Sequence, residues 1–319
     1  MMRARFLTLI CLVAALAACV DERNLPDDGF VDVPGGRIAF RVIGDGPSTP
    51  ALWIHGGPGG RSCGVVDHVS RIASERPVIL YDQLGAGYSD RITDLDRYAR
   101  LARFVEEVVA IREELGLDEL HLIGQSWGNA IALEYMLTED PTGIKSIAFV
   151  SPFFGTEQWI ADGAVLLEQM PAEAQAVVAK AIEDEKFDSP EFEAVNDEFL
   201  RKHVRRTPRE KLDLSACDIT PGGDSGLYEY MWGAAEFVST GTLKDYDRID
   251  RLAELDLPVL FVTGEYDQAR PETVYYYQSL VQGSKVEVMP DSGHLVYLDQ
   301  TALFNDTLVD FFRGVDQSK

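Results

Sequence analysis

The sequence predicts an α/β protein in which a mostly parallel sheet is flanked by helices and a helical cap is inserted after a core strand. Apolar runs of strand length alternate with helical patterns over most of the chain, as in parallel sheets that are covered on both faces. The pattern changes at Phe153, because from there to Gly241 only helical periodicity is found. We therefore expect the core to comprise residues 29–153 and 242–319, and the cap to comprise residues 154–241.

The first residues of the chain predict an export signal. Two arginines precede the apolar run Phe6–Ala15, which is too short to span a membrane and has the charge pattern of a secretory signal. The stretch Leu16–Cys19 (L-A-A-C) resembles a bacterial lipobox, in which Cys19 would be lipidated, although residues 15–17 also fit an ordinary A-x-A cleavage site. We expect residues 1–18 to be a lipoprotein-type signal peptide and residues 19–28 a tether. The exported protein would then be held by lipid at a membrane, facing the periplasm or the cell surface.

Composition and charge exclude several classes of protein. The formal net charge of −24 is the opposite of the basic footprint that nucleic-acid binding requires. Such a charge could attract cationic substrates, but a solvated acidic surface is its more common origin. No cysteine–histidine cluster has zinc-ligand spacing, so we expect no metal and no cofactor. Cys63 and Cys217 remain after processing, and the sequence leaves open whether they form a disulfide or stay as free thiols.

Each predicted strand is a short apolar run bounded by turn residues. The first two, Phe30–Val33 and Arg37–Ile43, are joined at Pro34-Gly35-Gly36 and so begin the sheet as a hairpin. The remaining predicted strands are Ala51–His55, Pro77–Tyr81, Leu120–Ile123, Ile144–Val150, Pro258–Thr263 and Lys285–Met289.

Helices are predicted where apolar residues recur every three or four positions. In Leu101–Leu115 these positions share one face, and Gly116 ends the helix. The other predicted helices are the one that follows Gly128, then Ala161–Gln169, Ala172–Glu185, Glu191–Val204, Leu227–Phe237 and Thr301–Arg313.

The pattern G-x-S-x-G at Gly124–Gly128 lies between a predicted strand and a predicted helix. A sharp turn in this context holds the serine in a strained conformation with its oxygen exposed. The following helix also directs free N–H groups and its positive end toward charge that develops there. A chance serine in a glycine-bearing turn would give the same short pattern, so Ser126 needs support from other residues.

That support comes from a possible catalytic triad. Serine becomes a good nucleophile when a base takes its proton, and the base needs an orienting carboxylate. In α/β-hydrolases these residues follow in the order Ser, Asp or Glu, His, and Ser126, Asp267 and His294 satisfy it. Each follows a predicted strand, so the three can converge at the carboxyl edge of the sheet. Glu265 is the local rival of Asp267, which is preferred because it lies deeper in the loop.

A glycine-rich loop, His55-Gly56-Gly57-Pro58-Gly59-Gly60, follows the third predicted strand. It lacks the lysine of a phosphate-binding loop and does not fit G-x-G-x-x-G, so a nucleotide site is not indicated. Glycines leave backbone N–H groups accessible to a reacting atom, as the second half of an oxyanion hole requires.

Four motifs together resemble the proline iminopeptidase (prolyl aminopeptidase) family, a branch of the α/β-hydrolases that also includes L-amino-acid amidases. They are the glycine-rich loop at residues 55–60, Tyr81–Ser89 (Y-D-Q-L-G-A-G-Y-S), Gly124–Gly128 and Gly264–Asp267. The similarity runs from about Phe30 to the C-terminus and implies a capped fold. Asn129 departs from the family, in which a glycine or small residue is common there, and we expect it to affect packing more than chemistry.

The resemblance also implies roles for individual residues. Gly57 and Trp127 would donate the N–H groups of the oxyanion hole. Glu236 lies in a segment, Met231–Phe237, that resembles the family's cap motif, and it would bind the free α-ammonium of the substrate. Alternatively, Glu236 is an exposed charge on the surface of a helix and does not bind substrate. The candidates for a second amine-binding glutamate are Glu193 and Glu198.

The leading prediction is a serine aminopeptidase that releases an N-terminal residue, with proline favoured, from short peptides or amides through an acyl-enzyme. An L-amino-acid amidase, or an esterase or lactonase on the same triad, is the alternative. An esterase of neutral substrates has no use for a buried anion at Glu236. A surface-anchored binding lipoprotein with an inactive hydrolase fold is the non-enzyme alternative, and the intact triad argues against it. The oligomeric state is left open.

Overall fold

The structure is a computed structural model that describes residues 25–208, 210, 217, 226–233, 235–236 and 238–318. The predicted signal peptide (residues 1–18) and most of the predicted tether, including Cys19, lie outside the described residues. Within the described ranges, no helix has the length and apolar character needed to cross a membrane.

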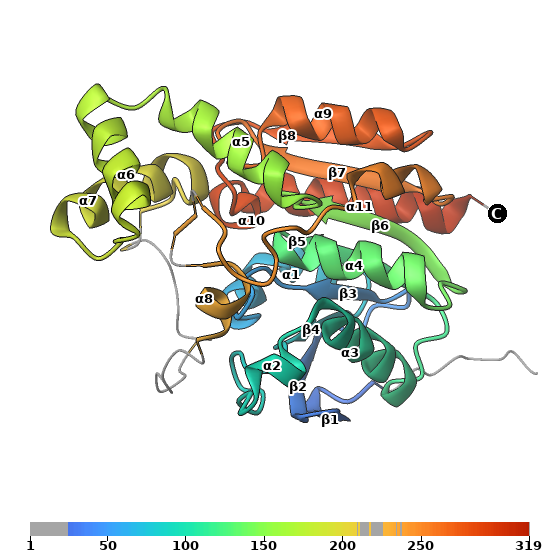
Figure 1. Ribbon diagram of the computed structural model, residues 1–319. Coiled ribbons are helices and arrows are strands. Elements are labelled where there is room, and N and C mark those ends of the chain that lie inside the picture. Colours follow the sequence, from blue (N-terminus) through green and yellow to red (C-terminus); the bar gives the residue numbers. More distant parts are fainter. Residues whose placement is uncertain are drawn as a thin grey trace, which may run out of the picture.

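An eight-stranded sheet in the order β1-β2-β4-β3-β5-β6-β7-β8 forms the centre of the protein (Figure 1). β2 pairs antiparallel with β1 and with β4, and every other pair is parallel. This confirms the predicted α/β-hydrolase fold with its mostly parallel sheet. The strands are β1 (Asp28–Val33), β2 (Gly36–Ile43), β3 (Ala51–Ile54), β4 (Val78–Tyr81), β5 (Leu120–Gln125), β6 (Ile144–Val150), β7 (Val259–Gly264) and β8 (Lys285–Met289).

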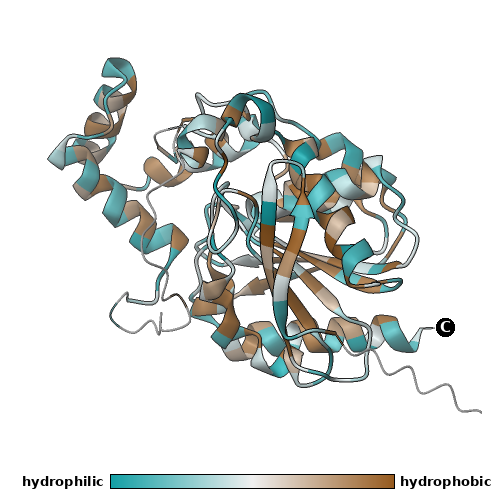
Figure 2. Cartoon of the chain, turned by 90° about the horizontal axis from the view of Figure 1, so that it is seen from below, coloured by the Kyte–Doolittle hydropathy of each residue, from teal (hydrophilic) through white to brown (hydrophobic). Residues whose placement is uncertain are grey.

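Helices cover both faces of the sheet because successive strand side chains point to opposite sides. On one face, Leu52 and Ile54 of β3 belong to a core shared with α3, α4 and α9. On the other face, Ala51 and Trp53 of the same strand pack with α1, α10 and α11. Figure 2 shows mostly hydrophobic strands in the interior and, around them, helices that contain both hydrophobic and hydrophilic residues. The core helices are η1 (Cys63–His68, 3₁₀), α1 (Ser70–Ala73), α2 (Leu95–Tyr98), α3 (Leu101–Glu114), α4 (Trp127–Thr138), η5 (Ile249–Glu254, 3₁₀), α9 (Pro271–Leu280), α10 (Val296–Asp299) and α11 (Thr301–Gln317).

A helical segment lies between β6 and β7. Helices α6 and α7 pack on each other through their own apolar cluster, which includes Val178, Phe192 and Phe199, and they extend away from the sheet (Figure 1). The helices of this segment are α5 (Thr156–Leu167), α6 (Ala172–Asp184), α7 (Pro190–Phe199), the π-helix η2 (Leu200–Val204) and α8 (Leu227–Met231).

The predicted helix Leu227–Phe237 is wrong over its second half, because α8 ends at Met231. Gly233 follows with a φ of 138°, a conformation that other residues rarely adopt. A Cβ atom at Gly233 would also lie 2.8 Å from the hydroxyl oxygen of Thr240. The chain therefore turns back after α8, and Glu236 lies in a loop rather than on a helix surface.

Candidate active site

Ser126 lies at the sharp turn between β5 and α4, with a φ of 54° and a ψ of −122°. A residue with a side chain rarely adopts this conformation, and such strain is typical of functional turns. The flanking glycine is needed for space, since a Cβ at Gly128 would lie 2.0 Å from the carbonyl oxygen of Ile54. The turn places Ser126 in the wall of a cavity at the carboxyl edge of the sheet.

Asn129 supports this turn through hydrogen bonds. Its Nδ2 donates to the carbonyl oxygens of Ser126 and Val150, each at 2.9 Å. The sequence analysis expected Asn129 to affect packing more than chemistry. The structure shows that Asn129 ties the serine turn to the end of β6.

Asp267 and His294 come together on the loops that follow β7 and β8. The Nδ1 of His294 donates to Oδ1 of Asp267 at 2.8 Å, and both side chains are buried. Asp267 also accepts from the backbone N–H of Ala269 (2.8 Å), while the hydroxyl oxygen of Thr263, which donates to the carbonyl oxygen of Ala269 at 2.7 Å, lies 3.1 Å from Oδ2 of Asp267. The hydrogen bond between His294 and Asp267 fixes the tautomer of His294 and leaves its Nε2 available to accept a proton. The rival, Glu265, is exposed and accepts a backbone N–H instead.

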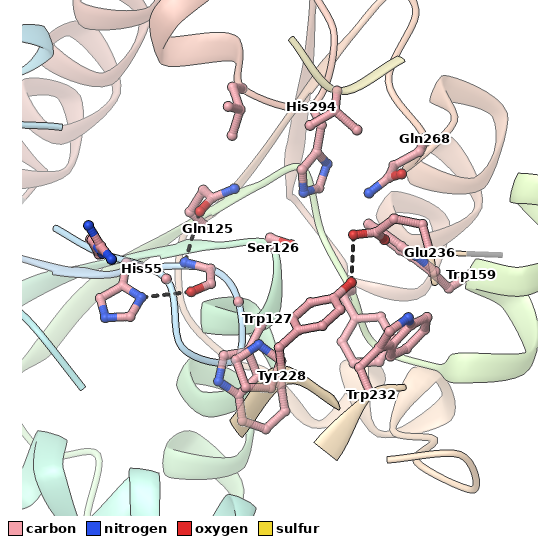
Figure 3. A pocket seen from close by; sticks show the side chains of 18 of the residues that line it. His55, Gln125, Ser126, Trp127, Trp159, Tyr228, Trp232, Glu236, Gln268 and His294 are labelled. Carbon is pink, nitrogen blue, oxygen red and sulfur yellow. Dashed lines mark hydrogen bonds between the residues drawn. The ribbon is translucent and has the colours of Figure 1, made fainter. Parts of the chain in front are cut away.

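Ser126 and His294 face the same cavity, as Figure 3 shows. Within the described part of the chain, the hydroxyl of Ser126 has no hydrogen-bond partner. Bonds between a nucleophile and its base often tighten only when substrate is bound, so this geometry is compatible with a Ser–His–Asp triad.

Two backbone N–H groups are positioned for an oxyanion hole. Gly57 has a φ of 133°, and a Cβ there would lie 2.6 Å from the amide nitrogen of Gly59, so only glycine fits. Trp127 is the first residue of α4, where an N–H has no partner within the helix. Among the described residues, neither N–H donates a hydrogen bond, and both residues line the cavity of Ser126.

Buried side chains hold the glycine-rich loop in place. The N–H of Gly56 donates to Oε1 of Gln125 at 2.8 Å. Gln83 donates through Nε2 to the carbonyl oxygen of His55 (2.7 Å) and accepts from the indole N–H of Trp127 (3.1 Å). Burial lowers the pKa of His55, whose Nε2 accepts from the backbone N–H of Gln83 at 3.0 Å. Gln83, the second residue of the D-Q motif, therefore connects the glycine-rich loop to the start of α4, a role that the sequence analysis did not assign.

Glu236 lines the same cavity on the side opposite the oxyanion loop (Figure 3). Its Oε1 accepts a hydrogen bond from the hydroxyl of Tyr228 at 2.6 Å. Burial and the neighbouring Glu236 raise the pKa of Tyr228, so this hydroxyl remains protonated and donates. Within the described ranges, no lysine, arginine or histidine forms an ion pair with Glu236. The cavity therefore contains a partly buried carboxylate without a cationic partner.

The expectation of a second cap glutamate in the site is not met by Glu193 or Glu198. Both lie on α7, which packs on α6 away from the sheet. Glu193 is exposed, and Glu198 pairs with Lys202 at 2.8 Å. Of the described residues that line the cavity, Glu236 is the only acidic one.

Aromatic side chains form much of the remaining wall of the cavity, whose volume is about 240 Å³. Phe153 packs edge-to-face against Trp159 and Trp232, and Trp159 lies edge-on to His294 with ring centroids 5.4 Å apart. Pockets for drug-sized ligands have volumes of roughly 300–1,000 Å³, so this site suits a smaller group. No cluster of three or more potential metal ligands occurs in the described part of the chain.

Two connections attach the helical segment to the catalytic loops. Cys63, just after the glycine-rich loop, forms a disulfide with Cys217, with their Cα atoms 5.2 Å apart. His203 of η2 donates through Nδ1 to the carbonyl oxygen of Tyr266 (2.8 Å), and its own carbonyl accepts from the N–H of His294 (2.9 Å). The structure buries His203 between the loops of Asp267 and His294.

Comparison with known proteins gives the family. A family model described as the alpha/beta hydrolase fold matches residues 50–301. The proline iminopeptidase of Heyndrickxia coagulans is 38% identical over 291 residues, which cover 90% of this chain and 99% of that protein. The chain belongs to the proline iminopeptidase family of α/β-hydrolases.

Other members of the family show the same relation. The proline iminopeptidase of Lactobacillus delbrueckii subsp. lactis is 33% identical over 281 residues, covering 86% of this chain and 94% of that one. A crystal structure of the proline iminopeptidase of Mycobacterium smegmatis has a TM-score of 0.81 and 27% identity, covering 91% of this chain and 98% of that chain. The resemblance found in the sequence motifs is thereby confirmed, and the protein is a serine hydrolase of this family.

Proposed function

We propose that this member of the proline iminopeptidase family is a serine aminopeptidase. It would release an N-terminal residue, with proline preferred, from short peptides or amides. The observation that carries the proposal is the carboxylate of Glu236, which faces the cavity of Ser126 and has no cationic partner among the residues that the structure describes. A buried carboxylate favours a substrate with a free α-ammonium and disfavours one whose N-terminus is blocked. The names of the relatives support the same activity.

In the proposed mechanism, the hydroxyl oxygen of Ser126 attacks the carbonyl carbon while Nε2 of His294 takes the hydroxyl proton. Asp267 holds His294 in the required tautomer and stabilises the imidazolium that forms. The N–H groups of Gly57 and Trp127 stabilise the oxyanion of the tetrahedral intermediate. His294 then donates its proton to the leaving amine as the C–N bond breaks. A water molecule, deprotonated by His294, releases the amino acid from Ser126.

Two other activities would use the same triad. An L-amino-acid amidase shares the need for a free ammonium and differs in its leaving group. An esterase or lactonase of neutral substrates gains nothing from Glu236, which is why the aminopeptidase is favoured. An inactive binding lipoprotein would need no Asp267–His294 hydrogen bond and no accessible serine, so it is disfavoured.

The test of this proposal is a rate comparison on 4-nitroanilides of proline, alanine and leucine and on N-acetylproline 4-nitroanilide. We expect the highest kcat/KM for prolyl 4-nitroanilide and negligible turnover of the acetylated compound. Faster turnover of the acetylated compound would refute an aminopeptidase, because a blocked N-terminus carries no ammonium for Glu236 to bind.

We also propose that the protein is an exported lipoprotein anchored through Cys19. The support is the L-A-A-C sequence after an apolar run, together with the Cys63–Cys217 disulfide, since disulfides persist in oxidising compartments. Cys19→Ala should either block processing or move the protein from the membrane fraction to the soluble periplasm, without changing its intrinsic activity. A wild-type protein that is soluble and carries no acyl group at its N-terminus would refute the anchor.

A further inference from the structure

The cavity of Ser126 has two walls that belong to different apolar cores. The first wall belongs to the core that packs α3, α4 and α9 on the sheet, and the second belongs to the core on the opposite face. Residues of the first wall are Phe153, Trp159, Tyr228, Trp232 and Leu243. Residues of the second wall are Val65, Leu295 and Tyr297.

The proposed mechanism gives each wall a different half of the substrate. Glu236 belongs to the first wall through its hydrogen bond with Tyr228, so the acyl half, with its ammonium, lies there. The leaving amine takes its proton from His294, and Leu295 of the second wall follows His294 directly. The leaving half of the substrate therefore extends along the second wall, to which neither the sequence analysis nor the mechanism assigns a role.

Arg61 is the only lysine or arginine among the described residues that line the cavity. It lies between Gly60, the last residue of the glycine-rich loop, and Val65 of the second wall. The backbone after it is fixed, because the N–H of Ser62 donates to Oδ1 of Asp82 at 2.8 Å and the next residue is held by the disulfide. The side chain of Arg61 is exposed, and within the described part of the chain it forms no ion pair.

The charges of the protein oppose the binding of a free peptide at this wall unless a cation is present. The formal net charge of −24 and the carboxylate of Glu236 both repel the C-terminal carboxylate that a free peptide carries on its leaving half. A guanidinium counteracts this repulsion, because its planar fork can donate two parallel N–H groups to a carboxylate. Glu236 and Arg61 together match the two charged ends of a zwitterionic peptide.

We propose that Arg61 binds the C-terminal carboxylate of the substrate, so that the preferred substrates are short free peptides rather than amides or arylamides. This inference rests on the proposed aminopeptidase function. Glu236 selects for a free amine, and Arg61 selects for a free carboxylate on the leaving half. A single side chain can do this only for short peptides, because each extended residue moves the carboxylate about 3.3–3.6 Å farther from the scissile bond.

The test measures kcat/KM for prolylglycine, for prolylglycylglycine and for the C-terminal amide of each, with the released proline quantified by chromatography. Glycine has no charged side chain, so each acid differs from its amide only at the C-terminus. We expect the wild type to prefer the acid at one or both lengths. Arg61→Gln should lower this acid-to-amide ratio about threefold to thirtyfold, a range between the effects of an exposed ion pair and of a hydrogen bond to a buried charge.

Two further variants separate a contact with the carboxylate from a general effect of charge. Arg61→Lys keeps the charge but not the planar fork, so it should retain part of the preference for the acid. Arg71→Gln is the matched control, because Arg71 lies on α1, pairs with Asp306 and does not line the cavity. It removes the same charge from the protein and should leave the acid-to-amide ratio unchanged. This ratio does not depend on the folded fraction of a variant.

Several results would overturn the inference. They are a wild type that prefers the amide at both lengths, a ratio that Arg61→Gln leaves unchanged at both lengths, and a ratio that Arg71→Gln lowers as much as Arg61→Gln does. The underlying activity is tested separately with N-acetylprolylglycine. If the wild type hydrolyses this compound as efficiently as prolylglycine, the aminopeptidase itself is refuted. If only the ratio test fails, the aminopeptidase stands and Arg61 has no part in its specificity.

Discussion

Replacing Glu236 by glutamine removes one charge from the cavity while keeping the shape of the side chain. The new carboxamide can still accept the hydrogen bond from Tyr228 that Glu236 accepts at 2.6 Å. The substrate's ammonium, however, loses its only acidic partner among the described residues of the cavity. An α-amino group has a pKa of about 7.7–8.0, so most substrate is cationic at neutral pH and depends on that partner.

The size of the effect follows from the burial of Glu236. Two unit charges about 4 Å apart at an effective dielectric constant of about 20 attract by about 4 kcal/mol. Glu236 is partly exposed, so solvent screens part of this energy. Breaking buried charge pairs typically costs about 2–5 kcal/mol, and we expect the lower part of that range, about 2–4 kcal/mol. This corresponds to a loss of about 30-fold to 700-fold in kcat/KM for prolyl 4-nitroanilide.

The assay compares this loss with the change on 4-nitrophenyl acetate, which has no ammonium and should be cleaved by Glu236→Gln nearly as fast as by the wild type. Glu229→Gln is the control, because Glu229 lies in the neighbouring helix α8 but is exposed. It should leave both rates unchanged. If Glu236→Gln slows both substrates equally, Glu236 is structural and the reasoning about the ammonium is refuted.

Three further changes test other parts of the structure. Ser126→Ala should reduce turnover by many orders of magnitude without changing the thermal unfolding temperature, and substantial turnover by the purified variant would remove Ser126 from its role. Cys63→Ser should lower the free energy of unfolding by about 2–5 kcal/mol, because the disulfide joins residues 154 positions apart; an unchanged denaturation midpoint would argue against a stabilising cross-link. Burial raises the pKa of Glu107 from 4.5 to about 8, although the positive charge of Arg103 opposes this rise. The protonated form is therefore favoured in the fold, and the stability it contributes is present below about pH 4.5 and lost as the pH rises through about 8. Glutamine at position 107 cannot ionise, so the thermal unfolding temperature of Glu107→Gln should rise relative to that of the wild type as the pH increases from about 4.5 to about 8. A difference between the two unfolding temperatures that does not change with pH would contradict this prediction.

The sequence predicted the framework of the site because its signals are local. Apolar runs located every strand of the sheet, and Ser126, Asp267 and His294 each follow one of them. The carboxyl ends of parallel strands lie at the same edge of the sheet, so residues that directly follow these strands are brought to that edge. The preference for Asp267 over Glu265 rested on depth in the loop, and in the structure Asp267 is buried while Glu265 is exposed.

The sequence patterns could not predict contacts between segments that lie far apart in the chain. Nothing in the spacing of Cys63 and Cys217 decides whether they meet, because that depends on how the segment between β6 and β7 folds back. The same holds for His203, whose burial depends on two loops that come later in the chain. Glu193 and Glu198 were the candidates for a second amine-binding glutamate, but both lie on α7, which extends away from the cavity.

The most direct test of the proposed activity is to trap the acyl-enzyme. Prolyl 4-nitrophenyl ester would be mixed with the enzyme, the reaction stopped with acid within the first turnovers, and the peptides mapped by mass spectrometry. We expect a prolyl group on the peptide that contains Ser126, and no such group when the substrate is N-acetylated or when Ser126 is replaced by alanine. Turnover with the prolyl group on another residue, or equal labelling by the acetylated ester, would contradict an aminopeptidase that acts through Ser126.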